Sequence, residues 1–239
     1  MITNMIFDTH VHTNLSSCSN LKIDDILTHA GSRGLNGVCL TDHQTMDIRH
    51  HLKEGIQDNG LCVIVGMEYS TTDGDFLIFG PFETIEPGLP AIRLLEMVRQ
   101  RDGIAIAAHP FRTGRSVSEF IIRDGWCDIV ESVNGRNSFT ENQKVDSWRQ
   151  RYALTECCGS DAHALNELGK VTTCLTAPVR SRDDFIRAFK NGCCDTNHHS
   201  QTTECPHHQT SSGTMPYYDT TARRGTMLRT QPSTVPALP

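Results

Sequence analysis

Short apolar runs alternate with segments of helical periodicity over residues 1–192 of this chain. Short apolar runs bounded by polar residues or glycine predict buried strands, and apolar positions three and four residues apart predict helices. The predicted strands cover residues 5–7, 37–40, 61–65, 76–79, 104–108, 128–131, 155–159 and 171–175. The predicted helices cover residues 23–33, 47–58, 90–101, 117–123, 140–151 and 182–190, with a capping box from Thr140 to Gln143. This repeated β-then-α order favours a parallel α/β barrel or a doubly wound sheet.

The composition of the chain changes near Gly192. From Cys193 to Pro239 the sequence is rich in Thr, Ser, Gln, His and Pro, has few aliphatic residues, and carries acidic and basic residues that cancel. Such a segment cannot bury enough apolar surface to offset the entropy lost on ordering. We therefore predict one α/β domain over residues 1–192 and a disordered, low-complexity tail over residues 193–239.

Bulk composition narrows the class of protein. Hydrophobic residues make up 37% of the 239 positions and charged residues 21%, which is typical of a soluble globular protein. No apolar run approaches the roughly 20 residues that span a bilayer, and the first residues lack the pattern of a signal peptide. We therefore expect a cytoplasmic protein without a membrane partner. The net charge of −6 argues against an extended nucleic-acid surface.

Five of the eight histidines in residues 1–192 come directly after predicted strands, and two acidic residues follow strands in the same way. In parallel α/β folds the carboxyl ends of the strands meet on one face, so these side chains should share a small volume. A single histidine at a strand end is commonly a hydrogen-bonded or solvated residue. Five of them interleaved with acids instead predict a centre for divalent metal ions. The seven candidate ligands are His10, His12, His43, Glu68, His109, Asp161 and His163.

The spacing of these residues supports the same prediction. In His10-Val11-His12, an extended backbone directs both imidazoles to one face, because side chains alternate along a strand. Asp161-Ala162-His163 repeats the arrangement near the other end of the domain.

Five segments also resemble, in order, the motifs of the PHP (polymerase and histidinol phosphatase) family. They are Asp8-Thr9-His10-Val11-His12-Thr13, Thr41-Asp42-His43, Gly66-Met67-Glu68, Ala108-His109-Pro110 and Gly159-Ser160-Asp161-Ala162-His163. The resemblance covers residues 5–190. It implies a distorted (β/α)7 barrel with two or three divalent ions, zinc, manganese or iron, at the strand ends.

The resemblance implies that His10, His12, Glu68 and Asp161 hold paired metals and that His43, His109 and His163 are the remaining ligands. Two positions depart from the family pattern. Cys18 stands where many members have aspartate, and it either binds metal as a thiolate or is a spectator beside a weak third site. Asp75 stands where many members have histidine, and it either replaces that ligand or faces solvent.

The resemblance further implies metal-dependent hydrolysis of phosphomonoesters, nucleotide phosphates or phosphodiesters, with a small phosphorylated substrate or a short nucleotide as the partner. A hydroxide that bridges the metals would attack phosphorus in line, and His163 or Asp161 would protonate the leaving alkoxide. Arg112 and Arg136 follow predicted strands, and arginine suits bidentate contact with phosphate. For each of these two the alternative is an ordinary surface arginine.

Two other functions stay open at this point. Multinuclear His/Asp centres also catalyse amidohydrolase-like cleavage of C–N or C–O bonds, for which an apolar pocket would be expected and the two arginines would not. A non-catalytic regulatory or polymerase-associated PHP module would have a degenerate site, whereas the candidate ligand set here is nearly complete.

Overall fold

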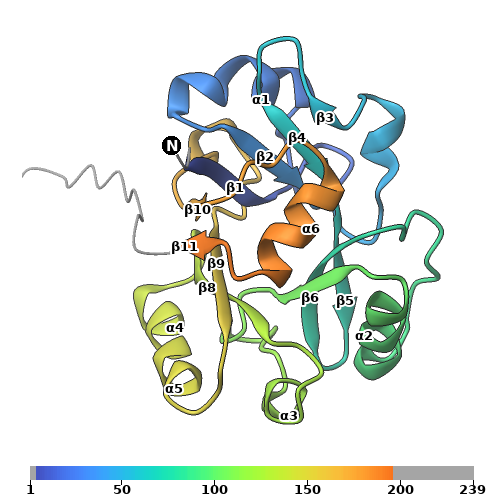
Figure 1. Cartoon of the computed structure of the whole chain (residues 1–239), viewed down its shortest axis with the longest axis vertical. Coiled ribbons are helices and arrows are strands. Elements are labelled where there is room, and N and C mark those ends of the chain that lie inside the picture. The colour runs from blue at the N-terminus through green and yellow to red at the C-terminus, as the bar shows by residue number, and fades with distance from the viewer. Residues whose placement is uncertain (1–3, 196–239) are drawn as a thin grey trace, which may run out of the picture. The chain divides into compact units, whose positions relative to one another are not determined.

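A computed structural model describes residues 4–195, and its strands form two sheets (Figure 1). The first sheet has the order β11-β10-β1-β2-β4-β3 and the second has the order β5-β6-β7-β8-β9. The strands of the first sheet are β1 (Met5–Val11), β2 (Gly37–Leu40), β3 (Gly55–Ile56), β4 (Cys62–Val65), β10 (Thr173–Leu175) and β11 (Cys194–Asp195). Those of the second are β5 (Met67–Thr71), β6 (Gly74–Phe79), β7 (Ile104–Ala107), β8 (Ile129–Asn134) and β9 (Thr155–Gly159).

The predicted α/β class is confirmed, whereas the strands form two open sheets instead of the distorted (β/α)7 barrel that the resemblance implies. Strands β1, β2 and β4 run parallel, as do β7, β8 and β9, but β5, β6 and β7 are antiparallel and β10 is antiparallel to β1. The chain passes between the sheets at Gly66, where a Cβ atom would lie 2.6 Å from the Phe79 ring and 2.8 Å from the Ile78 carbonyl oxygen. The antiparallel β5–β6 hairpin follows directly, so the strands do not continue the parallel β/α order of a (β/α)7 barrel.

Isolated bridges still connect the two sheets at one end. Val11 pairs with Ala162, and His43 pairs with Glu68, so the ends of β1 and β2 lie against segments of the second sheet. Away from these bridges, the sheets share an aromatic core in which the Phe185 ring lies 6.1 Å from that of Phe7 and 4.8 Å from that of Phe79. The apolar core thus joins the sheets and leaves their bridged ends for polar side chains.

The helices largely follow the predicted periodicity. They are α1 (Ile23–His29), α2 (Ala91–Gln100), α3 (Glu119–Arg123), α4 (Phe139–Gln143), α5 (Val145–Arg149) and α6 (Arg182–Lys190), with 3-10 turns η1 (Gly31–Arg33), η2 (Asp47–His50) and η3 (Leu165–Glu167). None of the helices within residues 4–195 is long and apolar enough to cross a membrane. The cytoplasmic location stays a prediction.

Two helix predictions are wrong. The predicted helix at 47–58 is the single turn η2 followed by β3, because Gly55, with φ at 105°, leaves the helical region and residues 55–56 pair with β4. The predicted helix at 140–151 is split into α4 and α5, and its capping box joins Ser138 to Glu141. The extended backbone of Ser138, with ψ at 156°, makes it the residue that precedes the first turn.

Of the predicted tail at 193–239, Cys194 and Asp195 form β11 against β10. Residues 196–239 lie outside the described residues.

Candidate metal centre

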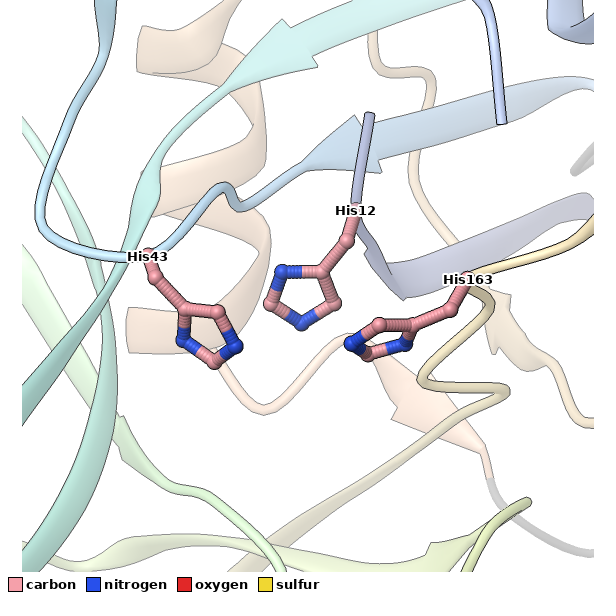
Figure 2. Close-up of side chains that lie close together, drawn as sticks. All are labelled: His12, His43 and His163. Atoms are coloured by element: carbon pink, nitrogen blue, oxygen red, sulfur yellow. The ribbon is translucent and has the colours of Figure 1, made fainter. Parts of the chain in front are cut away.

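The structure brings all seven candidate ligands together at the bridged ends of the two sheets. Figure 2 shows the rings of His12, His43 and His163 turned toward a common space. Three of the seven come from the ends of β1 and β2, Glu68 lies within β5, and the others follow β7 and β9. Sequence analysis had placed Glu68 after a strand, because β5 was not predicted. The seven residues are His10, His12, His43, Glu68, His109, Asp161 and His163.

The Glu68 carboxylate lies in the middle of four imidazoles. Its Oε2 atom is 3.5 Å from His10 Nε2, 3.2 Å from His12 Nε2 and 3.0 Å from His43 Nδ1. Its Oε1 atom is 2.7 Å from His109 Nε2. Since Glu68 is 1% exposed, the four imidazole nitrogens surround one carboxylate that is almost fully shielded from water.

Asp161 lies near two of these imidazoles, His10 and His12, and near His163. Its Oδ1 atom is 3.3 Å from His12 Nε2, 3.6 Å from His10 Nε2 and 3.4 Å from His163 Nδ1. The Nε2 atoms of His10 and His12 are themselves only 3.0 Å apart. Two imidazole nitrogens at this distance, bracketed by two buried carboxylates, are the arrangement expected around a cation.

Within the described residues, the ligand atoms form three groups whose members lie within 4.8 Å of one another. We refer to these as the three ligand groups. They are His12 with His43 and His163, His10 with His12 and Glu68, and Glu68 with Asp75 and His109. Nitrogen and oxygen donors in this mixture suit zinc, manganese or iron, so the residues present fit divalent ions.

The two positions that depart from the family pattern differ in the structure. Asp75 is buried, and its Oδ2 lies 3.8 Å from His109 Nε2 within the third ligand group, so it does not face solvent. Cys18 is exposed and lines the adjoining cavity, but belongs to none of the three ligand groups.

The charges of the centre shift the pKa values of its members. Burial lowers the pKa of His10, but the charge of Asp161 and of two nearby glutamates outweighs burial and raises that pKa well above its usual value. Burial raises the pKa of Glu68, yet the positive charge of His10 lowers it well below its usual range. Binding of a divalent ion to Nε2 of His10 would therefore compete with its protonation.

His163 has the opposite shift. Burial, and then the charge of His12, lower the pKa of His163 to about 4, so its imidazole is neutral near pH 7. Its Nδ1 atom lies 2.8 Å from the main-chain oxygen of Asp161. Because a carbonyl oxygen only accepts, Nδ1 carries the proton and Nε2 keeps its lone pair. This geometry suits a metal ligand better than a donor of protons to a leaving group.

Strained backbone occurs at the same place. His109 and Asp161 have φ angles of 30° and 54°, and Gln44, which follows His43, has 58°. Positive φ is uncommon for residues other than glycine and persists where surrounding contacts enforce it. Here the amide of His109 donates to Glu131 Oε2 at 2.8 Å, and the amide of Gln44 donates to the Glu68 carbonyl at 3.0 Å.

An open cavity of about 560 Å³ adjoins the centre. Arg112 is held in it by three contacts: its Nη2 atom lies 2.7 Å from Asn134 Oδ1 and 2.8 Å from Asp161 Oδ2, and its Nε atom lies 2.9 Å from Asn137 Oδ1. Arg136 also lines the cavity and is exposed. The lining residues are Ser17, Cys18, His43, Glu68, Arg112, Arg115, Arg136, Asp161 and His163.

Sequence analysis missed several residues around the centre. Arg115 lines the cavity and contacts Asp75 at 3.1 Å, and Glu131 contacts His10 from within β8. An acidic residue inside the apolar run Ile129-Val130-Glu131 was the available signal. Asp42, beside His43, accepts hydrogen bonds from Thr13 and Ser16 instead of facing the cluster.

Comparisons with known proteins identify the family of this chain. Residues 139–194 match the PHP-associated family model. An uncharacterized protein of Methanocaldococcus jannaschii is 32% identical over 114 residues, which are 44% of this chain and 67% of that protein. The chain belongs to the PHP domain family.

Solved structures share the fold. A two-domain protein from Bacteroides vulgatus that contains a predicted PHP-like metal-dependent phosphoesterase has a TM-score of 0.60 at 16% identity, over 80% of this chain and 64% of that one. The lesion-specific endonuclease of Pyrococcus furiosus has a TM-score of 0.63 at 18% identity, over 79% of this chain and 56% of that one.

Proposed function

We propose that this protein hydrolyses phosphate esters at a centre of two or three divalent metal ions. One observation carries the proposal: seven histidine and carboxylate side chains converge beside a cavity that also contains three arginines. Membership of the PHP domain family supports it, as does the structural likeness to a protein described as containing a metal-dependent phosphoesterase.

The three ligand groups, together with Asp161 beside His12, would hold the metal ions. His10, His12, Glu68 and Asp161 would hold the paired ions, and His43 and His163 would complete a site with His12. Asp75 with His109 and Glu68 would form the remaining site, which makes Asp75 the better additional ligand than Cys18. Divalent ions supply Lewis acidity toward a phosphoryl oxygen and lower the pKa of water.

The arginines of the cavity would bind the negative charge of the substrate. Arg112 is pre-organised by Asn134 and Asn137, so little side-chain entropy is lost when it contacts phosphate. Arg115 and Arg136 lie on the same cavity with exposed side chains. The cationic groups surround one cavity in a chain of net charge −6, which favours a small phosphorylated substrate or a short nucleotide over a long duplex.

A panel of phosphomonoesters, nucleotides and phosphodiesters, assayed with the zinc- and manganese-loaded protein, tests the proposal. We expect hydrolysis of at least one phosphoester that stops when the metal is removed. A fully loaded protein that cleaves an amide or lactone but no phosphoester would show that the amidohydrolase alternative is correct. A loaded protein that cleaves none of these substrates would support the non-catalytic module.

Replacing Arg112 with alanine should lower kcat/KM on a responsive phosphoester by about 10- to 100-fold, since a hydrogen bond to a charged group contributes about 1.5–3 kcal/mol. Metal content should not change at saturating zinc, because a guanidinium is not a ligand, and elemental analysis checks this since Arg112 also contacts the ligand Asp161. A rise in KM alone would mean that Arg112 grips the substrate, and a fall in kcat would mean that it also stabilises transition-state charge.

Steady-state kinetics give kcat and KM, and elemental analysis gives the metal content. Arg93→Ala is the matched control, because Arg93 lies on α2, is 74% exposed and pairs with Glu96 on the same helix. An unchanged kcat/KM in the Arg112 variant would contradict the proposed phosphate contact.

A further inference from the structure

Glu131 connects two candidate ligands that come from different sheets. From β8, its Oε1 atom lies 3.0 Å from Nδ1 of His10, which belongs to β1. Its Oε2 atom accepts from the His109 amide at 2.8 Å and from Asn134 Nδ2 at 2.8 Å. Glu131 and His10 are 1% and 0% exposed, so water does not compete for these contacts.

The contact between Glu131 and His10 requires a glycine at position 159, because a side chain there would occupy the space between them. Strand β9 is the neighbour of β8, and Gly159 at its end pairs with Asn134. A Cβ atom at Gly159 would lie 2.6 Å from His10 Cβ and 2.7 Å from Glu131 Oε1, closer than real Cβ atoms approach other groups. The missing side chain therefore leaves the space through which the carboxylate reaches the imidazole.

The contact defines which nitrogen of His10 carries a proton. An ionised carboxylate only accepts hydrogen bonds, so Nδ1 must donate. In the neutral imidazole that binds metal, Nε2 of His10 then has the lone pair and faces the other side, where His12 Nε2, Glu68 Oε2 and Asp161 Oδ1 lie 3.0, 3.5 and 3.6 Å away. A histidine that binds metal through one nitrogen commonly donates the other N–H to a carboxylate.

We infer that Glu131 is a positioning residue that holds His10 as the Nδ1-protonated tautomer, and the His109 backbone in place, so that both present Nε2 to divalent metal. The inference rests on the metal centre of the proposed function. It assigns Glu131 a part in metal affinity without making it a ligand, since both of its carboxylate oxygens already contact His10 Nδ1, the His109 amide and Asn134 Nδ2.

The variant E131Q tests this inference with little change of shape. An amide has one accepting oxygen and one donating NH2. In E131Q the amide oxygen should take the position of Oε2, because the His109 amide and Asn134 Nδ2 both donate there. The NH2 group then faces His10 Nδ1. Nδ1 must then accept, and the proton moves to Nε2, the atom that should bind metal.

We expect the zinc affinity of E131Q to fall about 10- to 100-fold, the usual effect of losing a partner behind a metal ligand. Competition with a colorimetric chelator gives the affinity, and elemental analysis gives the zinc bound per chain. E156Q is the matched control: Glu156 lies on the adjacent strand β9 and its Oε2 contacts Arg149 at 2.6 Å. Zinc affinity equal to wild type in E131Q, or an equal fall in E156Q, would overturn the inference.

A measurement on the wild-type protein does not depend on whether the variant folds. In zinc-loaded protein labelled with ¹⁵N-histidine, the nitrogen chemical shifts of His10 should show a protonated Nδ1 and a zinc-bound Nε2. The reversed tautomer would overturn the inference. Wild-type protein that binds zinc in this way but cleaves no phosphoester would contradict only the proposed function, whereas wild-type protein that binds no zinc would contradict both.

Discussion

Replacing His12 with alanine is expected to remove metal and phosphoester hydrolysis together. His12 belongs to two of the three ligand groups, and its Nε2 lies 3.2 Å from Glu68 Oε2 and 3.3 Å from Asp161 Oδ1. Its loss therefore weakens two sites at once and leaves buried carboxylates without a partner. Mutating a residue that only hydrogen-bonds to a metal ligand lowers metal affinity or activity by about 10- to 100-fold. Loss of the ligand His12 itself should therefore lower kcat by more than about a hundredfold.

Asp161→Asn should have the same effect for a different reason, because it keeps the shape of the side chain and removes the charge that attracts a cation. His50→Ala is the control for both variants, since His50 is 63% exposed and lies in none of the ligand groups. Elemental analysis beside steady-state kinetics makes the measurement. Full metal loading and wild-type turnover in the His12 variant would show that these imidazoles are not ligands.

Removing divalent ions with a chelator should destabilise the folded protein substantially. His10, His12, Glu68, His109 and Asp161 are all at most 2% exposed, so the centre concentrates ionisable groups away from water. A ligand that binds only the folded state stabilises it by about 4 kcal/mol when its free concentration is a thousand times Kd. For a domain of this size, 1 kcal/mol shifts Tm by about 2–4 °C, which predicts a fall of about 8–16 °C.

Thermal unfolding of chelated and zinc-loaded protein, followed by circular dichroism, measures this fall. Returning zinc to the chelated sample should restore the original Tm, and adding zinc to the His12→Ala variant should raise its Tm by much less. The metal centre would be in doubt if chelated and loaded wild-type protein unfolded at the same temperature.

Much of the candidate site follows from local sequence pattern. Alternation along an extended strand puts His10 and His12 on one face whatever the wider fold, and the apolar runs before His43 and His109 mark strands because buried strands need continuous apolar residues. Those features depend on neighbours in the chain, and for this reason they could be predicted. The same holds for α2 and α6, whose apolar positions recur at helical spacing.

Other features depend on contacts between distant segments. The antiparallel β5–β6 hairpin and the pairing of β3 with β4 are two such features. Glu131 meets His10 where Gly159 at the end of β9 leaves space between them, and Arg115, from the segment after β7, meets Asp75 on β6. Side-chain reach, strand register and close approach of backbones set these contacts, and none of them leaves a periodic pattern in the residues on either side.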